Sequence, residues 1–214
     1  MDSDFITISI GWTSDLAHYE GHLRRAIDDC AIALPACHYR IHGTNNVANS
    51  HYTADDILKN CAEMSCHVGL IIDPHKATKK LDEILNHQDA NTDYIILLTR
   101  QNIICHKPQD NYKHHTSRAA IITLKNCETG SDIRNISAIL LEHIMRHFFM
   151  QQNLYRHCSR RDCIMTPMEE YRNIQRLASY EQQFDADAYC RKCKVVLHKS
   201  PYWKDEYLSI IKYF

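Results

Sequence analysis

Four cysteines in two close pairs are the strongest constraint on how this 214-residue chain can fold. Cys158 and Cys163 lie close together, and Cys190 and Cys193 form a C-x-x-C. Two short thiol pairs separated by a longer segment are typical of a four-thiolate zinc site, because each tight turn directs two sulfur atoms at one point. Nearby cations would stabilise the doubly negative zinc–thiolate centre, and six basic residues flank the pairs: Arg156, Arg160, Arg161, Arg191, Lys192 and Lys194. We therefore predict one structural zinc ion here, in preference to reactive or merely buried cysteines.

The composition indicates an intracellular protein with reduced thiols. The formal net charge is −1, so no general attraction to nucleic acid or to anionic membranes is expected. Ten cysteines could suggest a secreted disulfide scaffold, but a chain of this length can build its own core. The first four residues include two aspartates and lack an apolar signal core, and no apolar run approaches the roughly 20 residues of a membrane span. We expect a cytoplasmic location and no membrane association, and the oligomeric state stays open.

Strand-like and helical segments alternate along the first 154 residues, which predicts an α/β domain. Residues 94–98 form a continuous apolar run, which is typical of a strand covered on both faces. The predicted strands cover residues 5–10, 37–41, 67–73, 94–98 and 118–124. The predicted helices cover residues 15–34, 53 to about 64, 76–86 and 132 to about 154.

The remaining segments are assigned more locally. Residues 103–105 are predicted as a short strand pairing with 94–98, and residues 107–115 as a polar loop. Residues 168–184 are predicted as a helix that bridges the two thiol pairs, and the aromatic tail 201–214 as a terminal helix. The predicted domains are an α/β domain, residues 1–154, and a small zinc-held subdomain, residues 155–214.

Several of these features together resemble the archaemetzincins, a family of zinc metallopeptidases in the metzincin clan. They are the stretch R-A-A-I-I-T-L, the long helix with histidines, H-C-x4-C-x-M from His157 to Met165, and the final C-x-x-C. The family carries H-E-x-x-H-x-x-G-x-x-H-C-x4-C-x-M and then C-x-x-C, in which three histidines hold a catalytic zinc and the glutamate activates a water. The resemblance covers most of the chain, although the spacer from Met165 to Cys190 is longer than usual for the family.

The resemblance implies a fold and a set of ligands. The implied fold is a metzincin-like mixed twisted sheet with a backing helix and an active-site helix. The implied residues are Met165 beneath the catalytic metal and the structural zinc ligands Cys158, Cys163, Cys190 and Cys193.

The catalytic half of the motif departs from the family pattern. Counted back from His157 without a gap, His147 takes the first ligand position and Phe148 takes the glutamate position. Gln151 takes the second ligand position, and its neutral amide oxygen is a poor zinc ligand compared with imidazole. Leu154 stands at the glycine position, where it disfavours a turn that needs a positive φ.

An alternative register pairs His143 with His147, which lie four residues apart and therefore on one face of a helix. This register requires four extra residues before His157 and places Ile144 at the glutamate position. Neither register supplies a general base, a group that typically contributes about 10²–10⁴ in rate. Glu142 precedes His143, so it lies on the wrong side of the helix turn to serve as the missing base.

We therefore favour a pseudo-peptidase that keeps one structural zinc and serves a binding or structural role with a protein partner. The candidate ligands of a second metal are His143, His147, Gln151 and His157, and we favour a collapsed histidine cleft over an occupied one. The alternative is an active zinc metallopeptidase, an aminopeptidase or protease, in which His143, His147 and His157 hold the metal. Its non-standard base would come from the nearby glutamates, Glu142, Glu169 and Glu170. We rank a nucleic-acid-binding zinc module last, because the net charge is not basic and the basic clusters already flank the thiolates.

Overall fold

The computed structural model describes residues 5–34, 36–66, 69–87, 91–103, 113–116, 118–125 and 191–197, and positions 140, 143, 144, 147 and 148. The chain divides into two compact units. The first comprises Met1–Arg24 and Cys37–Glu128, and the second comprises Arg25–Ala36 and Thr129–Phe214. The predicted domain boundary at residue 154 lies outside the described residues and stays a prediction. In the described part of the chain no helix is both long and apolar enough to cross a membrane.

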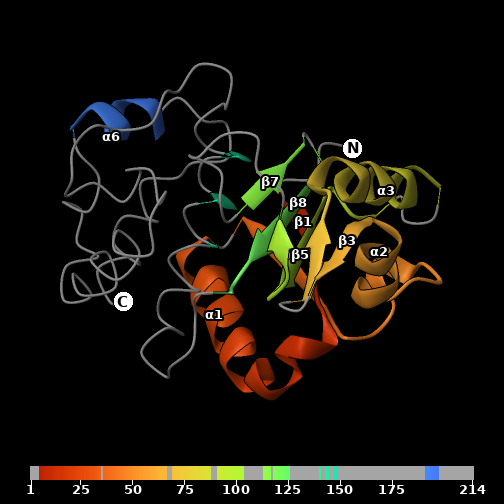
Figure 1. Ribbon diagram of the computed structural model, residues 1–214. Coiled ribbons are helices and arrows are strands. Elements are labelled where there is room, and N and C mark those ends of the chain that lie inside the picture. Colours follow the sequence, from red (N-terminus) through yellow and green to blue (C-terminus); the bar gives the residue numbers. More distant parts are fainter. Residues whose placement is uncertain are drawn as a thin grey trace. The chain divides into compact units, whose positions relative to one another are not determined.

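Five of the described strands of the first unit form a sheet with the order β2-β1-β5-β8-β7 (Figure 1). Four strands run parallel: β1 (Ile6–Trp12), β2 (Cys37–Gly43), β5 (Tyr94–Thr99) and β8 (Ala119–Thr123). The edge strand β7 (Lys113–His115) runs antiparallel to β8. This mixed sheet confirms the predicted α/β class.

A second, three-stranded sheet has the order β3-β4-β6. Strand β3 (Ala62–Cys66) is antiparallel to β4 (Gly69–Ile72), and β6 (Asn102–Ile103) is parallel to β4. Strand β4 falls within the predicted strand 67–73, of which residues 67 and 68 lie outside the described residues.

Three predicted helices agree with the structure in place and vary in extent. Two further helices, at residues 47–49 and 191–197, were not predicted, and the second of them carries Cys193, where the sequence indicated a tight turn. The predicted helix 15–34 consists of a 3₁₀ helix, η1 (Ser14–Tyr19), followed by α1 (Glu20–Ala33). A second short 3₁₀ helix is η2 (Val47–Asn49). The remaining described helices are α2 (Ala54–Asn60), α3 (Pro74–His87) and α6 (Arg191–Leu197).

Helices α2 and α3 cover one face of the large sheet (Figure 1). Their buried side chains pack in one cluster with alternate residues of β5 and β8, as strand geometry requires. The helix side of this cluster is Ile57 and Leu58 from α2, with Leu81, Ile84 and Leu85 from α3. The sheet side includes Ile95, Leu97, Ala119 and Ile121.

Strand β5 is buried along its whole length, which confirms the interpretation of its continuous apolar run. Ile95 and Leu97 belong to the cluster with α2 and α3. Tyr94, Ile96 and Leu98 point to the opposite face and are equally buried, each 0% exposed. An alternating pattern would have left one face polar, so the run of apolar residues encodes a central strand.

The prediction that the helix starting at Thr53 runs to about Met64 was wrong. Helix α2 ends at Asn60, and β3 begins at Ala62. The Cys61 N–H donates to the Leu58 carbonyl, which closes the last turn, and the Cys61 carbonyl accepts from Asp73. Pairing of β3 with β4 overrides the local helical pattern here.

Two short segments were also assigned wrongly. Ile103 pairs with Ile72 of β4, not with the strand at residues 94–98. Lys113–His115, placed in a polar loop by the sequence, forms strand β7 against β8. A polar sequence is common on an edge strand, where it discourages pairing with other chains, and it hides the strand from pattern analysis.

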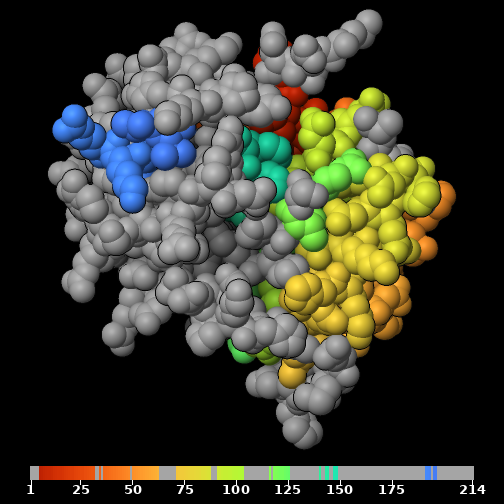
Figure 2. Space-filling view, turned by 90° about the horizontal axis from the view of Figure 1, so that it is seen from above, coloured from red at the N-terminus to blue at the C-terminus, as the bar shows by residue number. Residues whose placement is uncertain are grey.

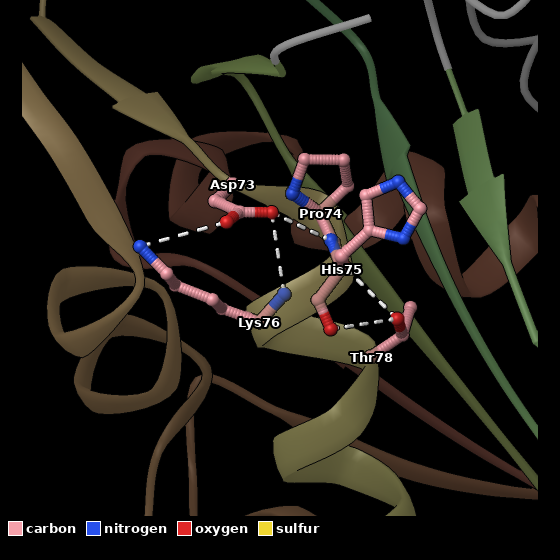
Figure 3. Close-up of polar contacts among 5 residues, drawn as sticks. All are labelled: Asp73, Pro74, His75, Lys76 and Thr78. Carbon is pink, nitrogen blue, oxygen red and sulfur yellow. Dashed lines mark hydrogen bonds and ion pairs between the residues drawn. The ribbon is translucent and has the colours of Figure 1, made fainter. Parts of the chain in front are cut away.

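The start of α3 is fixed by a cap that Figure 3 shows, and the capping residue also contacts the end of α2. Oδ1 of Asp73 accepts hydrogen bonds from the backbone N–H groups of His75, at 2.9 Å, and Lys76, at 3.3 Å. Pro74, the first helical residue, lacks an N–H that would need a partner. The Asp73 N–H donates to the Cys61 carbonyl at 3.0 Å, so one residue joins the end of β4, the end of α2 and the start of α3.

The same contacts set the pKa of Asp73. Burial alone would raise this pKa, but the N–H groups of Lys76 and His75, together with the Lys76 ammonium at 3.6 Å, outweigh it. The pKa of Asp73 therefore lies below its ordinary value, and the cap contributes stability above the pKa of the unfolded chain. This contribution is lost as the pH falls through the folded-state pKa.

We expect Asp73→Ala to lower the free energy of unfolding by about 1 kcal/mol, because two N–H groups of the first helical turn lose their acceptor. Urea unfolding at pH 7 measures the change. Lys76→Ala is the matched control: it removes only the ammonium of an exposed ion pair, so its effect should be smaller. Equal destabilisation by the two variants would contradict the cap.

Burial also controls the thiol of Cys37 at the start of β2. It raises the pKa of Cys37 from 9.0 to about 12, although a hydrogen bond with Tyr39 acts in the opposite direction. Since the folded-state pKa is the higher one, this neutral thiol contributes stability that is complete below pH 9.0 and lost as the pH rises toward 12.

We expect native Cys37 to resist alkylation by iodoacetamide at pH 8, because only the thiolate reacts and a pKa of about 12 leaves about 10⁻⁴ of the thiol ionised. Mass spectrometry of the labelled peptide, before and after unfolding in urea, measures this protection. Labelling of the native protein at the rate of the unfolded chain would rule the protection out.

Candidate metal centres

The histidine-bearing segment is helical at each of its described positions. Leu140, His143 and Ile144 have α-helical backbone, whereas His147 and Phe148 have π-helical backbone. Leu140 and Ile144 are 0% exposed and His143 is 1% exposed. Spacings of three and four therefore place these side chains on one buried helix face, as predicted for Leu140 and Ile144. The other positions of the predicted helix 132–154 lie outside the described residues.

His143 and His147 lie side by side on this helix. Their ring centroids are 6.2 Å apart, and the ring planes differ by 30°. Two imidazoles on one tetrahedral zinc, with Zn–N bonds of about 2.0 Å, would have centroids about 5 Å apart. The observed separation exceeds this value by about 1 Å.

The residues at the glutamate position in the two registers are hydrocarbon. Ile144 follows His143 and is fully buried. Phe148 follows His147 and packs edge-on against its ring, with centroids 4.5 Å apart and planes at 75°. Neither side chain can accept a proton from a metal-bound water.

Of the four cysteines predicted to hold the structural zinc, the structure describes Cys193. Cys193 lies in α6 and is 0% exposed, while its neighbours Arg191 and Lys192 are exposed. Figure 2 shows α6 at the surface, in blue. A buried thiol beside outward-facing cations fits the predicted thiolate ligand with flanking basic residues.

The other predicted site residues lie outside the described part of the chain: Gln151, His157, Cys158, Cys163, Met165 and Cys190. Among the described residues no group of three or more histidines, cysteines or carboxylates is arranged to hold a metal ion. The structure thus brings together His143 and His147 of the predicted set.

Sequence reasoning missed a polar junction at the carboxyl ends of β1 and β5. β1 and β5 are neighbours, and the parallel strands that follow them in the chain, β2 and β8, lie on opposite sides of the pair. Ligands often bind at such a position in α/β sheets. Here Asp15 accepts hydrogen bonds from the Thr13 hydroxyl and from the Gln101 side-chain amide, the latter at 2.8 Å. The junction uses these groups to tie the two loops to each other, and its signal in the sequence is polar residues following each strand.

We expect Cys193→Ser to remove zinc from the purified protein and to destabilise the part of the chain that the ion holds. Binding of a structural zinc contributes on the order of 10 kcal/mol to folding in small zinc-held modules. Cys61→Ser is the matched control, because Cys61 is a buried thiol outside the predicted ligand set. Metal analysis and thermal melting measure both effects, and a zinc content unchanged in Cys193→Ser would refute the assignment.

No protein-family model matches this sequence, and no curated protein matches it. Solved structures do match. Archaemetzincin from Methanopyrus kandleri aligns over 93% of this chain and 97% of its own, with a TM-score of 0.56 and 12% identity. Archaemetzincin from Archaeoglobus fulgidus, solved as a complex with malonate, aligns over 89% and 99%, with a TM-score of 0.48 and 11% identity. The likeness to the Methanopyrus kandleri structure shows that the chain has the fold of an archaemetzincin, as the resemblance of its motifs implied.

Proposed function

We propose that this chain is a zinc-binding protein of archaemetzincin fold that has no peptidase activity and serves a binding or structural role. The observation that carries the proposal is the chemistry beside the histidine pair. Ile144 is buried on the helix face of His143, and the ring of Phe148 packs on the ring of His147. Both candidate positions for the base thus hold side chains that cannot move a proton.

The physical cost of this change is large. In a zinc peptidase the metal lowers the pKa of its water, and a carboxylate takes the proton and passes it to the leaving amine. Losing general acid–base catalysis typically costs about 10²–10⁴ in rate. A phenylalanine against the histidine also replaces water with an apolar surface where hydrolysis needs solvent.

The zinc in this proposal is structural. Cys158, Cys163, Cys190 and Cys193 would hold it, and a closed four-thiolate site would supply a cross-link rather than an exchangeable position for water. The burial of Cys193 supports this role, because catalytic ions keep an open coordination position whereas structural ions do not.

We further propose an intracellular location and a protein partner. Cys37 and Cys61 are buried thiols, and reduced thiols suit a reducing compartment. A protein that keeps its structural zinc and lacks peptidase activity still offers a folded surface for binding, so the role that we propose is binding of a protein partner.

The second candidate function is an active zinc metallopeptidase. The closeness of the His143 and His147 rings favours it, since two imidazoles one helical turn apart begin a three-histidine site. His157 would complete the site, and the base would have to come from Glu142, Glu169 or Glu170.

We expect the zinc-loaded protein to show no peptide hydrolysis that a chelator can abolish, because neither register supplies a base. The assay compares the wild type with a His147→Ala/His157→Ala double variant on a mixture of unstructured peptides. Equal background rates support the proposal. Cleavage by the wild type that disappears both with chelator and in the double variant would establish the metallopeptidase instead.

A further inference from the structure

We propose that an acidic segment of a protein partner binds to the exposed side of α3 that carries Lys76, Lys79 and Lys80. These three residues are called the lysine face below. Such binding deepens the proposed function and rests on it, because it gives the chemistry of the partner that the proposed role requires. It involves the first unit alone and neither of the candidate metal centres.

The three lysines project from neighbouring positions of α3 into solvent. Lys76 and Lys80 lie four residues apart and Lys79 lies three residues after Lys76, so their ammonium groups are close on the helix surface. The side chain of Lys76 is 60% exposed and that of Lys80 is 36% exposed. Lys79 is also exposed, and among the described residues no carboxylate pairs with it. Figure 2 shows α3 at the surface, in yellow.

Helix stability does not explain why the lysines stand at this end of α3. The amino end of a helix carries a partial positive charge and favours acidic side chains. Helix α2 follows this rule, with Asp55 and Asp56 in its first turn and Lys59 in its last. Helix α3 has no acidic residue in its first turn, and the lysine face precedes Asp82 and Glu83. Exposed residues that oppose a local preference in this way are expected where they serve binding.

An aromatic ring orders one of the three ammonium groups. The Lys80 ammonium lies 4.8 Å from the centroid of the Tyr52 ring. Tyr52 in turn packs against the buried cluster of α2 and α3, which holds the ring in place. A cation over an aromatic face keeps its charge. Because the Lys80 side chain is already ordered, it loses less entropy when an acidic ligand binds.

The carboxylates beside the lysine face favour an acidic peptide over a nucleic acid. Asp73 lies 3.6 Å from the Lys76 ammonium, as Figure 3 shows, and Glu83 lies 3.5 Å from that of Lys80. A nucleic acid carries a charge at every nucleotide and binds to continuous basic surfaces, which these carboxylates interrupt. The side chains of glutamate and aspartate rotate independently, so an acidic peptide can reach the ammonium groups and avoid the two carboxylates.

The test is fluorescence anisotropy of the full-length protein with a fluorescein-labelled octaglutamate peptide. We expect the wild type to bind the peptide and to lose affinity as the salt concentration rises, because salt screens exposed charges. Lys79→Gln/Lys80→Gln should weaken binding about fivefold, since two exposed ion pairs are lost. Lys79→Arg/Lys80→Arg keeps both charges and should bind as the wild type does. The matched control Arg25→Gln/Lys125→Gln removes two exposed cations outside α3 and should leave binding unchanged.

Circular dichroism checks that each variant keeps its fold, as expected for substitutions at the surface. The inference is overturned if the wild type does not bind octaglutamate, or if the control weakens binding as much as Lys79→Gln/Lys80→Gln does. Tighter binding of a uridine dodecamer through the same two lysines would also overturn it and make nucleic acid the ligand. Peptide hydrolysis by the zinc-loaded protein would refute the proposed function and leave the octaglutamate result unchanged, so the two failures are distinguishable.

Discussion

Burial of β5 on both faces is the constraint on which the described fold depends. Its six residues are all buried, and parallel neighbours on each side, β1 and β8, satisfy its backbone. One face requires α2 and α3 as a cover, which in turn requires that the chain cross over between strands. Packing in the core determines where the helices lie, and the helix caps and side-chain hydrogen bonds described above stabilise them there.

The sequence predicted those parts of the fold that the hydrophobic pattern determines locally. The apolar run at residues 94–98 and the spacing along α3 each have one low-energy solution, a central strand and an amphipathic helix. Strands β3 and β7 were not predicted because neither has the apolar pattern of a strand, and each forms by pairing with the next strand in the chain, β4 and β8. Residues 62–64 continue a helical pattern, and Lys113–His115 are polar, so only pairing with β4 and β8 makes strands of them.

The candidate metal centres show the same division. The four-residue spacing of His143 and His147 was sufficient to predict rings on one helix face, because helix geometry is local. The choice between the two registers was not accessible in this way. It depends on the local winding of the helix and on side chains at Ile144 and Phe148, whose burial and packing only the structure supplies.

The π-helical winding at His147 and Phe148 has a consequence for how such motifs are compared between proteins. A wide turn takes up one residue more than an ordinary turn, and each residue of an α-helix advances about 100° around the axis. In any helix that contains such a turn, the side chains that follow it are out of phase with those before it. Comparing metal ligands between helices with and without such a turn therefore requires their angular positions as well as their spacing in the sequence.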